Sequence, residues 1–280
     1  LDVLCEVDRL PGSDVKMKVD RFIKQGGGLV ATALVAAARL GARPAWIGAL
    51  GDDDFARFCV HDFEREGVGT EYIRTVSGKS VITAFIMAER ATGGRTILYT
   101  VGEQPRTLPE QVQPEMLDGV RVMHVDLHFA EASLRAARLA REQGVTVTAD
   151  LEYPREGAEE MLALADYAIV PLGFVEAWLG VGELEPAAVA LFQKTGRGAV
   201  VTEGTHGSFV ATESERFHQP AYAVDVVDTT GCGDVYHGAF AFGLSKGYSL
   251  RETARIASAA AALKCRGLGG RQAIPTLAEV

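Results

Sequence analysis

The chain alternates short apolar runs with amphipathic segments along most of its 280 residues. Apolar runs of about four to eight residues predict buried strands, and apolar side chains at helical spacing predict helices. Their alternation implies an α/β fold, with a mostly parallel central sheet, right-handed crossovers and helices on both faces. The predicted strands are 45–47, 120–127, 145–150, 167–171, 199–202 and 208–211, and the predicted helices are about 29–40, 54–66, 131–143, 156–165, 173–179, 186–195, 233–246 and 250–264.

Four strand-like segments interrupt this alternation, at 3–7, 16–22, 81–89 and 96–101. No helical pattern separates the last two, and Gly93-Gly94 between them predicts a hairpin turn. We expect the four segments to form a small sheet that covers the ligand site as a lid. The prediction is therefore one domain, 1–280, with a lid formed by about 3–22 and 81–101.

Composition narrows the class of protein. With 48% hydrophobic residues the chain can bury one large core. A net charge of −9 argues against nucleic acid as a partner, because binding to phosphate backbones requires a basic face. Four scattered cysteines without metal-binding spacing favour reduced thiols, and no apolar run reaches the roughly 20 residues of a membrane span. We expect a soluble, cytoplasmic protein without a membrane partner. The chain opens at Leu1, inside a strand pattern and without Met, so we also expect residues to precede it.

The most informative motif is the segment 226–234, which reads V-V-D-T-T-G-C-G-D and precedes a helical pattern. We expect a strand at Val226-Val227, followed by a glycine-rich turn. Glycines let the N–H groups of residues 231–234 converge at a helix N-terminus, where the macrodipole favours an anion. We interpret Asp234 as a base that deprotonates a hydroxyl attacking phosphate. The alternative is that Asp234 only satisfies N-terminal amides of the helix.

This segment resembles the D-T-x-G-A-G-D motif of the PfkB (ribokinase-like) carbohydrate kinases, with Cys232 in place of Ala. The family's N-terminal motif is also similar to Gly26-Gly27-Gly28 and the segments 36–42 and 47–53. The resemblance spans nearly the whole chain and implies a three-layer ribokinase-like sandwich with a β-sheet lid. The flanks 217–220, 262–265 and 269–275 look most similar to the sulfofructose kinase branch.

The resemblance implies an ATP- and Mg²⁺-dependent kinase that phosphorylates a hydroxyl of a small carbohydrate, and it allows a homodimer formed through the lid. Asp234 would be the catalytic base. An ordinary aspartate has a pKa of about 3.9, so its proton transfer should occur late in the reaction. The implied phosphate-binding residues are Thr229, Gly231, Cys232 and Gly233; the ATP-binding residues are Thr202, Gly204, Gly207 and Ser258; and the substrate-binding residues are Asp2, Lys16, Gly27, Gly28, Thr32, His128 and Asp234.

Several positions depart from the family or leave alternatives open. Relatives carry N-x-x-E near Pro171 to organise Mg²⁺ through water; here the Asn is missing and Glu176 is displaced. The backbone carbonyls of Asp228 and Thr230 are candidates for a K⁺ site. His128 stands where sulfofructose kinases have Arg, so that an acidic sugar remains an option with Lys16. Ser258 can instead be a tight-packing position.

Other readings of the sequence are less well supported. The segment 26–31 fits G-x-G-x-x-A, but no acidic residue follows the next strand to hold a ribose, which disfavours a dinucleotide site. His124 and His128 share a predicted strand face without a third metal ligand in register. A nucleoside kinase would need aromatic lid residues such as Phe85 and Tyr99. A non-catalytic sugar- or nucleotide-binding protein would have no need for Asp234.

Overall fold

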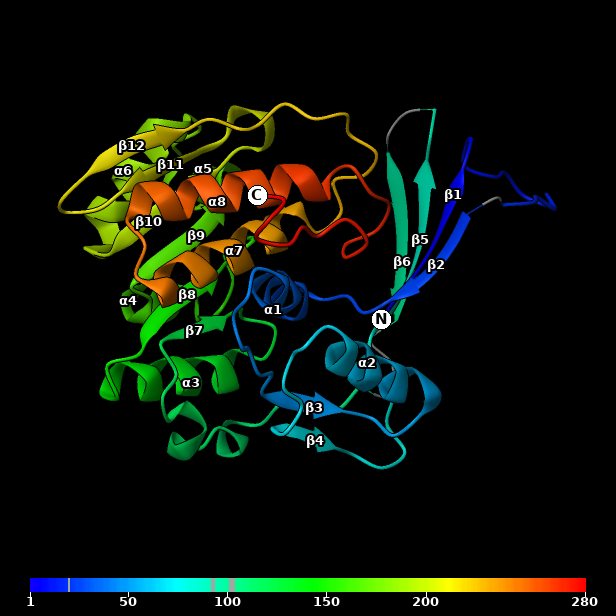
Figure 1. The fold of residues 1–280 in the computed structure, drawn as a ribbon, viewed down its shortest axis with the longest axis horizontal. Coiled ribbons are helices and arrows are strands. Elements are labelled where there is room, and N and C mark those ends of the chain that lie inside the picture. The colour runs from blue at the N-terminus through cyan, green and yellow to red at the C-terminus, as the bar shows by residue number, and fades with distance from the viewer. Residues whose placement is uncertain (20, 92–93, 101–103) are drawn as a thin grey trace.

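A six-stranded sheet forms the centre of the molecule (Figure 1). The computed structural model describes residues 1–19, 21–91, 94–100 and 104–280. The strand order is β12-β11-β10-β9-β8-β7, in which β7 to β10 run parallel and the β10–β11 and β11–β12 pairs are antiparallel. The strands are β7 (Val122–Val125), β8 (Thr146–Asp150), β9 (Tyr167–Pro171), β10 (Gly198–Thr202), β11 (Ser208–Ala211) and β12 (Arg216–Gln219).

Helices cover both faces of this sheet, which gives three layers. Alternate residues along a strand point to opposite faces, and the two cores divide accordingly: Val170 and Val201 belong to one core, while Ile169 and Val200 belong to the other. Helices α3 (Ala130–Glu142), α4 (Ala158–Leu164), α5 (Leu172–Leu179) and α6 (Leu184–Thr195) cover the first face, and α1 (Leu29–Arg39), α7 (Cys232–Lys246) and α8 (Leu250–Lys264) cover the second.

The lid is a separate four-stranded sheet that projects from the body (Figure 1). Its order is β2-β1-β5-β6, with β1 (Asp2–Val7), β2 (Arg21–Gln25), β5 (Thr83–Glu89) and β6 (Arg95–Thr100). β1 runs parallel to β5, whereas the outer pairs are antiparallel. The predicted α/β fold with a β-sheet lid is therefore confirmed. Gly93 and Val101, at the predicted hairpin and strand end, lie outside the described residues.

Two strand predictions were wrong in position. Lys16 does not lie in a strand as predicted. The strand that pairs with β1 is β2, which begins at Arg21, and the antiparallel pairing runs from Asp2 opposite Gln25 to Glu6 opposite Arg21. Ala45 makes only an isolated bridge to Gly69, and the strand begins later, at β3 (Gly48–Leu50), which pairs with β4 (Ile73–Thr75). Trp46, which suggested a buried strand, instead packs on a helix: its ring centroid lies 5.6 Å from that of Phe63 on α2 (Asp54–Arg65).

The segment at Val226-Val227 is also not a strand. Both side chains are exposed, and the amides of Val227 and Asp228 donate to the Cys265 carbonyl at 2.8 and 3.2 Å. This segment is therefore tied to the end of α8 rather than to a sheet. Sequence analysis also missed β12, whose residues alternate between exposed and buried at the antiparallel edge. Among the described residues, no helix has the length and apolar character required to cross a bilayer.

Candidate active site

The segment 226–234, which leads into α7 and is called the anion loop below, makes its sharp turn at a glycine. Gly231 caps the helix with φ 74°, and a Cβ there would lie 3.0 Å from the Gly270 Cα. A side chain is therefore disfavoured both by the left-handed backbone and by the close approach. The Cys232 amide donates to the Thr229 carbonyl at 3.2 Å and so belongs to the turn, which differs from the expectation that all four amides face an anion. Asp234 lies in the first turn of the helix.

Asp228 holds this loop in shape. Its Oδ1 accepts from the Thr230 amide and hydroxyl, and its Oδ2 accepts from the Gly269 amide at 2.7 Å. Although burial opposes it, these hydrogen bonds and the Lys264 ammonium hold the pKa of Asp228 below its usual value. Lys264 is fully buried, and its Nζ donates to the Asp228 carbonyl at 2.8 Å. One of the two carbonyls considered for K⁺ thus already faces a cation.

Asp234 lies in unusually unfavourable surroundings for a carboxylate. Burial, the nearby carboxylate of Glu152 and the Cys232 thiol raise the pKa of Asp234 to about 8, although Arg271 opposes the shift and Asp2 adds to it. The pKa is far above the ordinary value expected from sequence, because the site is desolvated and rich in negative charge. A carboxylate with this pKa is a much stronger base than an ordinary aspartate once it is ionised.

Cys232 has a partner in Cys265 at the end of α8. The Cys265 thiol lies within hydrogen-bonding range and lowers the pKa of Cys232 to about 6, despite partial burial, with Lys264 and the Gly233 amide assisting. The same interaction raises the pKa of Cys265. The interaction therefore favours the thiolate at Cys232 over Cys265.

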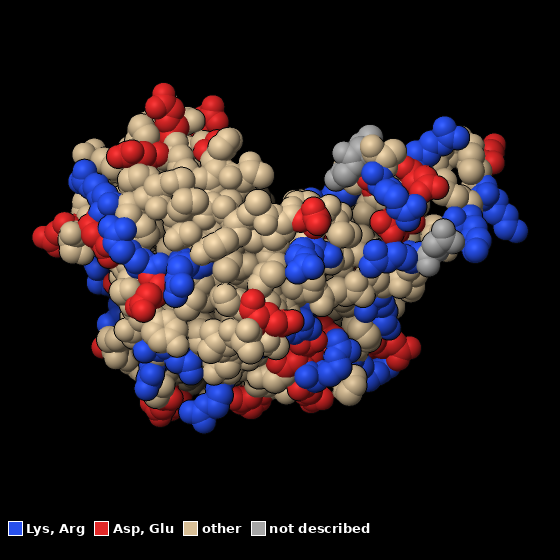
Figure 2. Space-filling view, turned by 45° about the horizontal axis from the view of Figure 1, so that its top comes forward, with Lys and Arg blue, Asp and Glu red and all other residues tan. Residues whose placement is uncertain are grey.

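A large open cavity of about 960 Å³ is lined by the start of β1, the glycine segment 26–28, the residues that follow β7, and Arg271. Figure 2 shows the molecule hollowed between the lid and the body. Gly27 lies against Asp2 in the cavity wall, and a Cβ there would fall 2.4 Å from the Asp2 carboxylate, so that a side chain at Gly27 would displace Asp2. Burial raises the pKa of Asp2. The polar and glycine lining that matters here comprises Asp2, Gly27, Gly28, Asp126, His128 and Arg271.

Arg271 connects the glycine segment 26–28 to the rest of the body. This segment links the lid strand β2 to α1 and is called the lid hinge below. The Arg271 guanidinium donates to Asp62 at 2.8 Å, to the Gly27 carbonyl at 3.1 Å and to the Thr32 hydroxyl at 3.4 Å. Arg271, Asp62 and Thr32 are all buried. Thr32, predicted to bind substrate, therefore lies directly behind the arginine. The residues just before Arg271 reach the anion loop, since Gly270 packs on Gly231 and the Gly269 amide bonds Asp228.

The lid also reaches the anion loop. On β6, the Arg95 Nη1 donates to the Thr229 hydroxyl at 3.4 Å. Arg95 contributes to the low pKa of Cys232, so its positive charge is felt across the loop. This contact brings a cation from the lid to the place where an anion is expected.

The remaining predicted residues are more scattered. Thr202 ends β10, Gly204 and Gly207 have positive φ around η3 (Gly204–His206), and the Ser258 hydroxyl donates to the Pro220 carbonyl at 3.1 Å. Ser258 thus anchors the segment that leads to the anion loop, which fits the packing alternative. Lys16 is exposed and outside the cavity lining, and Glu176 is exposed on α5 with its carboxylate beside Gly182.

Sequence reasoning missed three charged residues of the site: Asp126, Glu152 and Arg271. Asp126 and Glu152 follow β7 and β8 at their carboxyl ends, where ligands of parallel sheets bind, and this placement was the available signal. The Asp126 carboxylate accepts from the His128 amide at 2.9 Å, and burial raises its pKa. Arg271 gave no local signal, because its partners lie more than 200 residues away.

Comparison with known proteins identifies the class. A family model described as pfkB family carbohydrate kinase matches residues 1–277. The chain is 28% identical to the ribokinase of Haemophilus influenzae, covering 90% of this chain and 85% of that enzyme. A putative ribokinase from Agrobacterium tumefaciens superposes with a TM-score of 0.91 at 25% identity, covering 99% and 92% of the two chains. Aminoimidazole riboside kinase from Salmonella enterica, solved with aminoimidazole riboside and an ATP analog, gives 0.81 at 26% identity, covering 99% and 95%.

The chain belongs to the pfkB family of carbohydrate kinases. It is a kinase of the carbohydrate and nucleoside group within that family.

The first prediction concerns pH. A base at Asp234 would have to be ionised to act, so kcat/KM should rise with pH through an apparent pKa near 8 in the free enzyme and fall as the pH drops below it. Glu152→Gln removes a negative charge that raises this pKa, so the acid limb should move to lower pH. The measurement is the pH profile of kcat/KM, with Glu156→Gln as the control. An unmoved limb in Glu152→Gln, or an equal shift in the control, contradicts the assignment.

The second prediction concerns the thiols. Cys232 should be alkylated before Cys5, Cys59 and Cys265, because its pKa is lowered to about 6. Peptide mapping after limited iodoacetamide treatment, with and without Mg·ATP, measures the order and the protection. Labelling should abolish phosphoryl transfer, whereas Cys232→Ala should retain it. Preferential labelling of another cysteine, or full activity after labelling of Cys232, contradicts a phosphate site at this loop.

Proposed function

We propose that this kinase transfers the γ-phosphoryl group of ATP, with Mg²⁺, to a hydroxyl of a small sugar or sugar acid. The supporting observation is the position of Asp234. It lies in the first turn of α7, next to the turn at Gly231, and the charges of Asp2 and Arg271 in the cavity wall act on the pKa of its carboxyl group. A hydroxyl held by the cavity and a phosphate held by the loop would therefore meet at this base.

The residues present suit a bound Mg²⁺. Asp234 and Glu152 gather negative charge that Arg271 only partly offsets, and oxygen ligands of this kind are those that Mg²⁺ prefers. Glu152 would hold the ion through water, in place of the displaced Glu176. Mg²⁺ supplies charge neutralisation on the phosphates.

The chain's own residues would then carry the transfer. The amides of Gly233 and Asp234 point to the helix N-terminus, where oxyanion charge is stabilised. Asp234 orients the attacking hydroxyl and takes its proton as the oxygen bonds to phosphorus. Arg95 on the lid brings a further cation to the loop when the lid lies over it, and lid closure would limit loss of ATP to water.

The cavity favours a polyhydroxy substrate over a nucleoside. Asp2 and Asp126 offer carboxylate acceptors for hydroxyl groups, while Arg271 and His128 offer donors that an acidic substituent could use. The aromatic lid residues considered for a base pocket, Phe85 and Tyr99, are exposed and outside the cavity lining.

A ligand screen tests this proposal directly. Thermal shifts are measured for a panel of sugars, sugar acids and nucleosides in the presence of Mg²⁺ and a non-hydrolysable ATP analogue, and each hit is assayed for ADP release. We expect the largest shifts and turnover with a sugar or sugar acid. Turnover confined to nucleosides would replace the proposal with a nucleoside kinase, and absence of turnover across the panel would refute it.

The third prediction concerns the base. Asp234→Asn keeps the shape of the side chain but removes its proton-accepting capacity, so kcat should fall by roughly 100-fold or more. Affinity for the ATP analogue, measured by calorimetry, should change little. A kcat near that of the wild type would remove Asp234 from the mechanism.

The fourth prediction concerns monovalent cations. We propose that the buried Lys264 ammonium takes the place of K⁺ at the Asp228 carbonyl. The wild type should then have equal kcat in KCl and choline chloride. Lys264→Ala leaves buried acceptors unpaired, so its kcat should fall roughly tenfold and recover in part with K⁺. The control is Lys246→Ala, which removes an exposed ammonium that bonds Gly41. A wild type that requires K⁺ contradicts this substitution.

The fifth prediction concerns assembly. The lid exposes large apolar side chains that a second lid would cover: Phe22, Phe85, Ile97, Leu98 and Tyr99. We propose a homodimer formed through these faces. Light scattering coupled to size exclusion should give twice the chain's 29.9 kDa, and Leu98→Asp should give the monomer mass. A wild-type monomer at micromolar concentration contradicts the dimer.

A further inference from the structure

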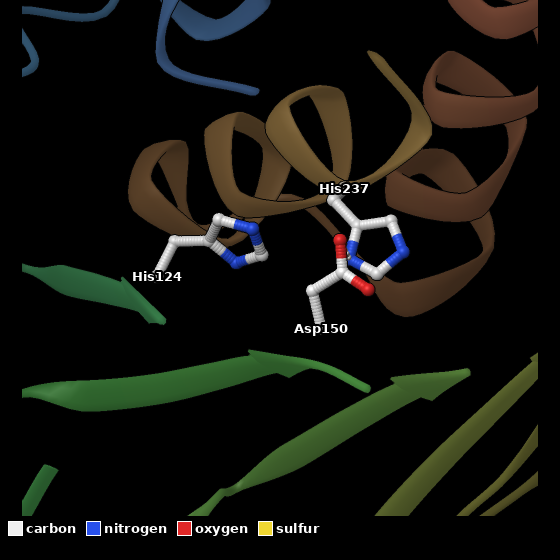
Figure 3. Close-up of side chains that lie close together, drawn as sticks. All are labelled: His124, Asp150 and His237. Atoms are coloured by element: carbon white, nitrogen blue, oxygen red, sulfur yellow. Dashed lines mark ion pairs between the residues drawn. The ribbon is translucent and has the colours of Figure 1, made fainter. Parts of the chain in front are cut away.

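A compact polar cluster lies beneath the active site. His124 on β7, Asp150 at the end of β8 and His237 on α7 come from three separate elements and converge between the helix and the sheet (Figure 3). All three are buried, with at most 8% of each residue exposed. One potential ligand atom from each lies within 4.8 Å of the others. His128, the other histidine considered from sequence, is exposed and is not part of this group.

The cluster does not satisfy its own hydrogen bonds. His124 Nδ1 lies 2.9 Å from the Thr148 hydroxyl, which leaves His124 Nε2 buried without a partner among the described residues. His237 Nδ1 is likewise buried without a hydrogen bond, at 3.7 Å from Asp150 Oδ2. That separation exceeds the roughly 2.7–3.2 Å of a protein hydrogen bond. Buried polar atoms are nearly always paired, so two such nitrogens facing one carboxylate require an explanation.

We propose that His124, Asp150 and His237 bind a divalent transition-metal ion such as Zn²⁺. Two imidazoles and one carboxylate form a donor set that suits Zn²⁺ and its neighbours, whereas Mg²⁺ prefers oxygen ligands alone. Zinc bonds of about 2.0–2.1 Å in tetrahedral geometry place ligand atoms about 3.3–3.5 Å apart. The 3.7 Å between His237 Nδ1 and Asp150 Oδ2 is close to this spacing, and the wider separations in the cluster, up to 4.8 Å, would contract on binding.

The surroundings of the cluster support coordination. Ligating histidines usually donate their second ring N–H to an oxygen, and the Thr148 hydroxyl is placed to accept from His124 Nδ1 and leave Nε2 with its lone pair. Burial lowers the pKa of His124 to about 4 and also lowers that of His237, so both rings are neutral at pH 7. His124 also lines the large cavity, which provides a route for the ion.

Such an ion would cross-link β7, β8 and α7. His237 lies one helical turn after Asp234, so the ion would fix the start of α7, on which the proposed base is carried. This inference does not depend on the kinase assignment, because binding is measured without substrate or ATP.

The experiment is metal titration of the chelator-treated full chain. Mass spectrometry of the dialysed protein should give one Zn²⁺ per chain, and Tm should rise by roughly 5–10 °C at free Zn²⁺ about 100 times Kd. His124→Asn and His237→Asn should each lose the bound ion and the shift. His61→Asn, which removes an exposed histidine on α2, should keep both. Asp234→Asn should also keep both, so a failed kinase mechanism would not be mistaken for a failed metal site.

Two spectroscopic measurements on the wild type keep the test decisive if a ligand variant does not fold. Co²⁺ should give visible d–d bands that Zn²⁺ removes, and X-ray absorption at the zinc edge should count two imidazoles. Less than 0.1 equivalent of retained ion, a shift that survives both histidine substitutions, or fewer than two imidazoles in the coordination sphere would overturn the proposal.

Discussion

The buried ion pair between Arg271 and Asp62 holds together the parts of the molecule on which the site depends. The Asp62 carboxylate accepts from Arg271 at 2.8 Å and from the Gly26 amide at 3.1 Å, while the same guanidinium bonds the Gly27 carbonyl. Three distant stretches of chain thus meet at one charge pair: the lid hinge, α2 and the C-terminal segment. Loss of one partner of such a pair typically costs about 3–5 kcal/mol, because the other charge is left buried and unpaired.

Several carboxyl groups of the site are buried close together, an arrangement that a bound cation would stabilise. Asp2, Asp126, Asp150 and Asp234 all have raised pKa values, for which burial is the largest cause. Repulsion from neighbouring carboxylates adds to burial at Asp150 and at Asp234. Acid groups held in this way are unfavourable for folding when ionised, and such arrangements concentrate at functional sites.

Much of the fold was predictable because its signals are local. The apolar runs at 167–171 and 199–202 became β9 and β10 within one residue, since a strand buried on both faces is apolar throughout. Trp46 and Val226 misled for the opposite reason: apolar character does not say whether a residue pairs in a sheet, packs on a ring or stays exposed. The anion loop and Gly27 were visible in the sequence because glycine spacing records backbone geometry. The Arg271–Asp62 pair and the raised pKa of Asp234 were not, because both arise from contacts between residues far apart in the chain.

Three consecutive residues near the C-terminus touch both halves of the site. Gly269 bonds Asp228 of the anion loop, Gly270 packs on Gly231, and Arg271 holds the Gly27 carbonyl at the cavity wall. A displacement of this segment at the anion loop would also shift the cavity wall, because the contacts to the two are made by adjacent residues. The affinities of two ligands bound at the cavity wall and at the loop would then be thermodynamically linked, and whatever factor the first ligand imposed on the second, the second would impose equally on the first.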